Sequence, residues 1–156
     1  MKTKLLLTLA AIAAVAGIAQ ATASKNNVGT QLPEMTLSYL GTAPVLKGKP
    51  LIVEFWATWC PPCRTSIPHL NELYKKFHAK GLEAVGITKE DEAVVKAFQK
   101  DLPMDYPVGI DKSGTISSSF GVRGIPHAML VDKSGKIVWE GHPMKLQESQ
   151  LEALVK

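Results

Sequence analysis

Cys60 and Cys63 are the residues of this 156-residue chain whose type and spacing most clearly allow chemistry. They are its only cysteines, and Pro61 and Pro62 separate them. A Cys-x-x-Cys pair can close a disulfide, open to a dithiol, or supply two ligands of a metal site. As a structural crosslink it would contribute little, because loop entropy gives roughly 2 kcal/mol for so small a ring, against about 3 for a fifteen-residue loop. The spacing therefore favours a bond that opens and closes in electron exchange.

The two cysteines fall where a buried strand is expected to give way to a helix. Residues 51–57 form a nearly continuous apolar run, which is typical of a central strand buried on both faces. A helix is predicted over 61–79, with Gly81 as its C-terminal stop. Free backbone amides and the positive end of the helix dipole favour a thiolate at such a helix start. This setting predicts reactive cysteines.

Pro61 and Pro62 limit the backbone amides that can donate to the Cys60 sulfur, and they would thereby tune the reduction potential of the dithiol. Both lie in the first helical turn, where a missing amide leaves no helical hydrogen bond unmade. They remove two amides that could have donated to the Cys60 sulfur, which leaves the amides of Cys63 and Arg64 as candidates. We expect Cys60 to be the exposed nucleophile and Cys63 the more buried resolving thiol in mixed-disulfide exchange.

Strands and helices alternate over the rest of the chain, which predicts an α/β fold with a mixed central sheet and helices on both of its faces. The dithiol then lies at the strand-to-helix end of the sheet, the expected place for a site. The charged run over 89–92 is interpreted as the start of a helix, with no further role. The other predicted elements are strands over 36–40, 82–88, 106–110, 128–131 and 136–140, and helices over 88–100, 115–120 and 146–155.

Residues 1–23 have the pattern of a secretory signal peptide. Two lysines precede an apolar stretch over 5–19, and the small-x-small pattern of a cleavage site follows at 21–23. Ser24 would then begin a single mature domain over 24–156. The apolar stretch is shorter than the roughly 20 residues that span a bilayer, so an uncleaved membrane anchor is the less favoured alternative. We therefore expect a periplasmic protein.

The charge of the chain argues against a nucleic-acid partner. The formal net charge of +4 falls to +2 once the two lysines of the leader are removed. We find no basic cluster with interleaved aromatic residues. The length suits one domain with a single core, and we expect a monomer.

Two segments resemble the TlpA/ResA-type exported thiol-disulfide oxidoreductases of the redoxin family. Residues 55–64 (Phe-Trp-Ala-Thr-Trp-Cys-Pro-Pro-Cys-Arg) match the active-site pattern of that family, and residues 121–126 (Gly-Val-Arg-Gly-Ile-Pro) match its cis-proline loop. The resemblance implies a thioredoxin-like three-layer fold with an N-terminal hairpin and an inserted helix-strand segment within 89–124. It also implies a cis bond between Ile125 and Pro126 against the dithiol.

Further site residues follow from that resemblance. The backbone of Ile125 would pair with an extended substrate segment, as in strand addition, and Trp59 would belong to the same docking surface. Thioredoxins carry a buried acid at the position of Glu54, where it helps to move the proton of the second cysteine. Alternatively, Glu54 reaches solvent or pairs with a lysine. Many relatives carry an acid where this chain has Ser66, which puts a helix-borne proton acceptor in doubt.

His127 departs from the family pattern, which has a small hydroxyl residue after the cis-proline. A charged His127 could stabilise the Cys60 thiolate and tune the dithiol. The alternative is a ring turned away from the sulfur.

The leading functional hypothesis is an enzyme without a cofactor that reduces or exchanges disulfides of exported proteins through Cys60 and Cys63. The resemblance points to reduction, for example of apocytochrome c, with electrons from a membrane donor of the DsbD/CcdA type. A metallochaperone holding Cu(I) or Zn(II) with the same thiolates and His127 or His69 is the alternative, although a second ligand pair at metal spacing is missing. A peroxidase ranks last, because Ala57 stands where peroxiredoxins carry a hydroxyl residue.

Overall fold

The computed structural model describes residues 26–156, and the strand β2, Leu51–Phe55, lies at the centre of its sheet. Every residue of β2 is buried, as the apolar run predicted. The sheet has six strands in the order β1-β4-β3-β2-β5-β6. The other strands are β1 (Ser38–Tyr39), β3 (Glu83–Thr88), β4 (Val108–Ile110), β5 (His127–Val131) and β6 (Ile137–Gly141).

The pairing of the strands makes the sheet mixed. β2 runs parallel to β3, and β3 runs parallel to β4. β5 and β6 complete the other side in antiparallel pairing, with Glu54 of β2 opposite Ala128 of β5. The same glutamate lies opposite Gly86 of β3. The neighbours of Glu54 on the sheet are therefore small, and the side chains of Trp56, Met104 and Tyr106 fill the space above Gly86.

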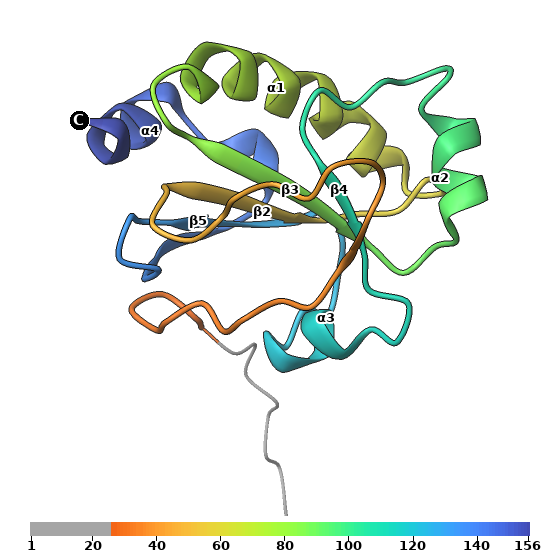
Figure 1. Ribbon diagram of the computed structural model, residues 1–156, viewed down its shortest axis with the longest axis horizontal. Coiled ribbons are helices and arrows are strands. Elements are labelled where there is room, and N and C mark those ends of the chain that lie inside the picture. Colours follow the sequence, from red (N-terminus) through yellow and green to blue (C-terminus); the bar gives the residue numbers. More distant parts are fainter. Residues whose placement is uncertain (1–25) are drawn as a thin grey trace, which may run out of the picture.

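Helices cover both faces of this sheet (Figure 1). α1 (Pro61–His78) and α4 (Glu148–Val155) pack on one face, where Phe77 and Leu151 join a core cluster with strand residues. α3 (Thr115–Ser119) lies on the other face, and α2 (Glu92–Phe98) packs beside the start of α1. A short 3-10 helix, Pro143–Lys145, precedes α4. The predicted α/β class with three layers is confirmed.

The N-terminal hairpin is a wrong prediction for the residues that the structure describes. β1 is only two residues long and pairs antiparallel with β4, which is far away in the sequence. A second contact of this segment is the isolated bridge between Gln31 and Lys136. The segment between 26 and 50 carries several glycines and prolines, so it lacks a second strand with which β1 could pair locally.

Two further predictions concern the N-terminal leader and the inserted helix-strand segment. The signal peptide over 1–23 and its cleavage site lie outside the described residues. A helix and a strand do occur between β3 and α3, namely α2 and β4, as expected for the inserted segment. Within residues 26–156, none of the helices combines the length and the apolar character needed to cross a membrane.

Candidate active site

Cys60 and Cys63 form a disulfide at the start of α1, with their Cα atoms 5.3 Å apart. Cys60 is the N-cap residue and has extended backbone angles, while Pro61 and Pro62 occupy the first positions of the helix. The amide of Cys63 donates to the Cys60 sulfur over 3.2 Å. The amide of Arg64 instead donates to the carbonyl oxygen of Cys60. Of the two expected donors, the helix start therefore aims one at the sulfur, where it would stabilise a thiolate.

The exposure expected for Cys60 is not found in the disulfide form. Cys60 is 3% exposed and Cys63 is fully buried. Both belong to an apolar cluster that also contains Trp56 and Ile67, with Ile125 packed against it. The Cys60 sulfur is bonded inward to Cys63, so little of this side chain faces solvent. Trp59, by contrast, is 71% exposed beside the disulfide.

Glu54 is a fully buried carboxyl group on β2. Tyr106 donates its hydroxyl to Oε2 of Glu54 over 2.7 Å, and Ser66 donates to Oε1 over 3.2 Å. Burial is the largest cause of the shift that raises the pKa of Glu54 to about 7, and the two hydrogen bonds oppose it. The carboxyl group therefore does not reach solvent or pair with a lysine. It can change its protonation state near neutral pH.

Ser66 connects this carboxyl group to the second cysteine. Its hydroxyl also lies 3.0 Å from the carbonyl oxygen of Cys63, one helical turn earlier. Ser66 is fully buried, so both contacts exclude water. Sequence reasoning noted Ser66 only as a missing acid and did not identify Tyr106. The spacing of three from Cys63 could have placed Ser66 on the same helix face. Tyr106 is separated from Glu54 by 52 positions and offered no local signal.

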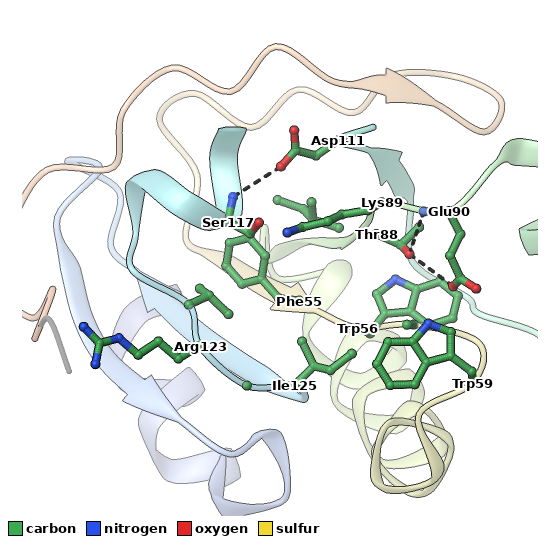
Figure 2. Close-up of a pocket in the computed structure, with 14 residues that line it drawn as sticks. Phe55, Trp56, Trp59, Thr88, Lys89, Glu90, Asp111, Ser117, Arg123 and Ile125 are labelled. Carbon is green, nitrogen blue, oxygen red and sulfur yellow. Dashed lines mark hydrogen bonds between the residues drawn. The ribbon is translucent and has the colours of Figure 1, made fainter. Parts of the chain in front are cut away.

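A pocket of about 430 Å³ lies next to the turn that leads into Cys60, with Ala57 and Trp59 in its lining (Figure 2). Trp59 and Ile125 line one part of it, and Figure 2 shows Glu90 beside the two tryptophans, with Lys89 and Asp111 farther from Trp59. The remaining lining is largely apolar, from Phe55, Trp56, Ala57, Ile87 and Val122, with Thr88, Ser117, Arg123 and Gly124. The peptide bond between Ile125 and Pro126 is cis. The loop that carries it thus shares a pocket with Trp59.

Glu90 has a role that the interpretation of 89–92 as a mere helix start missed. Its carboxylate accepts hydrogen bonds from the amide and the hydroxyl of Thr58, both 2.6 Å long. The hydroxyl of Thr88 adds a longer contact of 3.3 Å. Glu90 therefore fastens the turn that leads into Cys60 to the loop after β3. The helix α2 begins later, with Asp91 at its N-cap.

The contacts of His127 are with neighbours other than the disulfide. Its ring packs against Phe55 at a centroid distance of 6.4 Å. Its Nε2 lies 3.6 Å from Oε2 of Glu140 on β6. Phe55 and Glu54 are successive residues of β2, so their side chains point to opposite faces of the sheet. His127 therefore lies with Phe55 on the face opposite Glu54, and its contacts with Phe55 and Glu140 agree with the alternative of a ring turned away from the sulfur.

The metal-site alternative gains no ligands from the fold. Among residues 26–156, no group of three or more His, Cys, Asp or Glu side chains could hold a metal ion. His127 is engaged with Glu140, and Nε2 of His69 lies 3.1 Å from the carbonyl oxygen of Leu146. The arrangement that remains is a disulfide at a helix start, a buried carboxyl group joined to it through Ser66, and an apolar pocket next to the turn that leads into Cys60. Such a group of residues can carry out thiol-disulfide exchange.

Comparison with known proteins agrees with this chemistry. Residues 28–140 match the AhpC/TSA family. A thiol-disulfide oxidoreductase ResA from Bacillus thuringiensis subsp. konkukian is 36% identical over 137 residues, which cover 85% of this chain and 79% of the relative. A second ResA, from Bacillus subtilis, is 33% identical over 94 residues, which cover 60% of this chain and 52% of the relative.

Solved structures show the same likeness. A crystal structure described as a thiol:disulfide interchange protein DsbE from Chlorobium tepidum has a TM-score of 0.77 and 26% identity, and the match covers 85% of this chain and 100% of that one. The thioredoxin domain of a thiol-disulfide oxidoreductase from Bacteroides vulgatus has a TM-score of 0.73 and 27% identity with the same coverage. This chain belongs to the AhpC/TSA family and, within it, to the ResA-type thiol-disulfide oxidoreductases with a thioredoxin fold.

Proposed function

We propose that this enzyme reduces disulfides of exported proteins, with Cys60 as the nucleophile and Cys63 as the resolving cysteine. The observation that carries the proposal is the Cys60–Cys63 disulfide at the start of α1, with the Cys63 amide directed at the Cys60 sulfur. A ring of this size adds little stability, whereas an amide at a helix start stabilises the thiolate that exchange requires.

In the reduced enzyme, the Cys60 thiolate attacks one sulfur of the substrate disulfide. The other substrate sulfur leaves as a thiolate and takes a proton from solvent. The Cys63 thiol passes its proton to the Glu54 carboxylate, and its sulfur then attacks Cys60 in the mixed disulfide. The second substrate sulfur is released as a thiolate and takes its proton from solvent. The enzyme is left with its disulfide closed, and Glu54 then returns the Cys63 proton to solvent. The substrate has gained two electrons and two protons, and both electrons have come from the dithiol.

Glu54 suits the role of proton acceptor because of where it lies and how it titrates. Its carboxyl group is buried, and burial raises its pKa to about 7. A base with a pKa near the working pH is half ionised there and can both accept and release a proton. Glu54→Gln should therefore slow exchange at neutral pH and remove the rise of the rate through pH 7. An unchanged pH–rate profile would remove Glu54 from the mechanism.

The substrate segment would dock between Trp59 and the loop at Ile125 and Pro126. Trp59 is the large apolar side chain that stands exposed beside the dithiol, and Ile125 packs against the cluster that holds both cysteines. An extended segment could pair with the backbone of Ile125, while its side chains enter the neighbouring pocket.

The proposed setting is the periplasm, reached through the signal peptide over 1–23, with the mature chain from Ser24 acting as a single domain and a monomer. Because that compartment is oxidising, a reductant there needs electrons from a membrane donor of the DsbD/CcdA type. Disulfides of exported proteins, including those of apocytochrome c, would be the substrates. No metal or cofactor takes part in the proposed reaction.

The reduction potential of the Cys60–Cys63 couple tests the direction of electron flow. Equilibration of the protein in glutathione or dithiothreitol buffers, followed by alkylation and mass spectrometry, gives the value. A potential near the figure of about −270 mV for thioredoxin supports a reductant. A potential near about −120 mV, the figure for DsbA, would instead make the protein an oxidant.

A further inference from the structure

Ser66 holds a position between two acceptors that it cannot serve at once. Its hydroxyl lies 3.2 Å from Oε1 of Glu54 and 3.0 Å from the carbonyl oxygen of Cys63. A serine hydroxyl has a single proton to donate, together with lone pairs that accept. Ser66 can therefore donate to only one of the two acceptors at a time, and which one it donates to depends on whether Glu54 carries a proton.

Each protonation state of Glu54 has a complete set of partners. When Glu54 is ionised, Ser66 and Tyr106 both donate to it. When Glu54 is protonated, its own hydroxyl can donate to the Ser66 oxygen, and the Ser66 proton turns to the carbonyl of Cys63. Since an unpaired buried polar group is costly, a site that satisfies both states lowers the cost of moving the proton.

Tyr106 is the stronger of the two donors to Glu54. Its hydroxyl lies 2.7 Å from Oε2, and Tyr106 is itself buried. Burial and the nearby Glu54 raise the pKa of Tyr106 well above its usual value, so it remains a donor throughout the range in which Glu54 titrates. The phenol is held by the core of the protein, since its ring packs edge-on against Tyr74 at 6.2 Å.

The pKa of Glu54 is shifted by its burial and by the hydrogen bonds from these two hydroxyls. On the adjoining strands its neighbours are Gly86 and Ala128, which do not titrate. From α1, the neighbour of Ser66 is Cys63, which is bonded to Cys60. Asp105 precedes Tyr106 and acts on the tyrosine, but it is paired with Lys75 at 2.9 Å.

We propose that Ser66 and Tyr106 are the positioning residues that allow Glu54 to gain and lose its proton in place, with Ser66 moving its own proton between Glu54 and the Cys63 carbonyl. Neither residue touches the substrate. Ser66 couples the state of the carboxyl group to the helix turn that holds the resolving cysteine. The expected effect of Ser66 and Tyr106 on the rate of disulfide exchange rests on the proposed role of Glu54 as proton acceptor. Their expected effect on the titration of Glu54 does not.

The test is the titration of the Glu54 carboxyl carbon, followed by ¹³C NMR in the oxidised protein and assigned with Glu54→Gln. The wild-type midpoint is expected at about 7. Tyr106→Phe removes a donor to the ionised form and should raise the midpoint by about one pH unit or more. Ser66→Ala removes a donor to the ionised form and an acceptor of the protonated form, so it should raise the midpoint by up to about one pH unit, because the hydrogen bond to the charged form is the stronger of the two. Tyr106→Phe should have the larger effect, because its hydrogen bond is the shorter one.

Two matched variants control for the loss of a buried hydroxyl. The Ser117 hydroxyl donates to the carbonyl of Gly114 over 3.0 Å, the same helix-turn contact that Ser66 makes with Cys63. Ser117→Ala removes that contact without removing a donor to Glu54. Tyr74→Phe removes a phenol hydroxyl from the ring that packs on Tyr106. Ser66→Thr keeps the hydroxyl and should return the midpoint toward the wild-type value.

The outcomes separate this proposal from the proposed function. If Ser66→Ala and Tyr106→Phe leave the Glu54 midpoint within the spread of the Ser117→Ala and Tyr74→Phe controls, the proposal is overturned. If the midpoint rises in both variants and the pH–rate profile of disulfide reduction rises with it, the proposal and the role of Glu54 are both supported. If the midpoint rises while the pH–rate profile stays in place, the positioning role stands and the role of Glu54 in exchange falls.

Discussion

Glu54→Gln should change how the stability of the oxidised protein depends on pH. The carboxyl group is fully buried, and its folded-state pKa is raised from 4.5 to about 7, mainly by burial. Between these two values the folded state holds a proton that the unfolded state has released. The stability of the wild-type protein that is due to Glu54 is therefore present below pH 4.5 and is lost as the pH rises through 7. Glutamine does not ionise, so the stability of the variant should not fall in this way as the pH rises.

The size of the effect follows from the two pKa values. A gap from 4.5 to about 7 corresponds to about 3 kcal/mol, at 1.36 kcal/mol for each pKa unit. Glutamine has the shape of protonated glutamate and can still accept from Tyr106. The two proteins should therefore have similar free energies of unfolding near pH 4.5. Near pH 8 the variant should be more stable than the wild type by about 3 kcal/mol.

Urea unfolding of the oxidised proteins from pH 4.5 to 8.5 measures this difference. Glu152 is exposed on α4, so Glu152→Gln controls for the general loss of one carboxylate. The reasoning is refuted if the difference between Glu54→Gln and the wild type stays constant with pH. It is also refuted if the wild type gains stability relative to the variant as the pH rises through 7.

Three further variants test the parts around the dithiol. Trp59→Ala should change the free energy of unfolding by no more than about 0.5 kcal/mol, because the side chain is 71% exposed. It should nevertheless raise KM for a protein disulfide several-fold and leave the reduction of a small aliphatic disulfide unchanged; equal effects on both substrates would contradict a docking role. Glu90→Ala removes the acceptor of two 2.6 Å hydrogen bonds from Thr58, so it should lower the free energy of unfolding by about 1–3 kcal/mol. It should also speed hydrogen exchange of the backbone amides in the turn before the disulfide. Unchanged exchange in that turn would contradict the link between Glu90 and Thr58. Gly86→Ala would place a Cβ 2.9 Å from Nε1 of the buried Trp56 and should lower the free energy of unfolding, measured in urea, by about 1–3 kcal/mol. An unchanged free energy of unfolding would mean that the indole can move aside.

The local part of the site was predictable from the sequence. The apolar run before Cys60 and the helix-start prolines after it fix the strand, the turn and the helix through short-range patterns. Those patterns also placed Glu54 among buried residues. The cis bond at Pro126 is different, because only the family resemblance implied it and the residues themselves did not.

The long-range part of the site was not predictable, for a physical reason. Tyr106, just before β4, reaches Glu54, and Glu90, just after β3, reaches Thr58, only because the parallel pairing of β2, β3 and β4 brings distant segments together. A single sequence shows no periodicity that reports such a contact. The N-terminal hairpin failed for a related reason, since the partner of β1 is β4 and not a neighbour in the chain.

The burial of Cys60 is a property of the disulfide form, which a sequence pattern does not report. The side chain is 3% exposed while its sulfur is bonded to Cys63, although the attacking form of the enzyme is the reduced one. A motif identifies the pair of sulfurs, but it does not say which of them faces the substrate in each state.

Trapping of the mixed disulfide is the most direct test of the claim that Cys60 attacks and Cys63 resolves. The reduced Cys63→Ser variant should accumulate a covalent adduct with a disulfide substrate, and peptide mass spectrometry should locate the adduct on Cys60. The reduced Cys60→Ser variant should form little or no adduct under the same conditions. An adduct that forms mainly on Cys63 in the Cys60→Ser variant, or no adduct in either, would contradict the assignment.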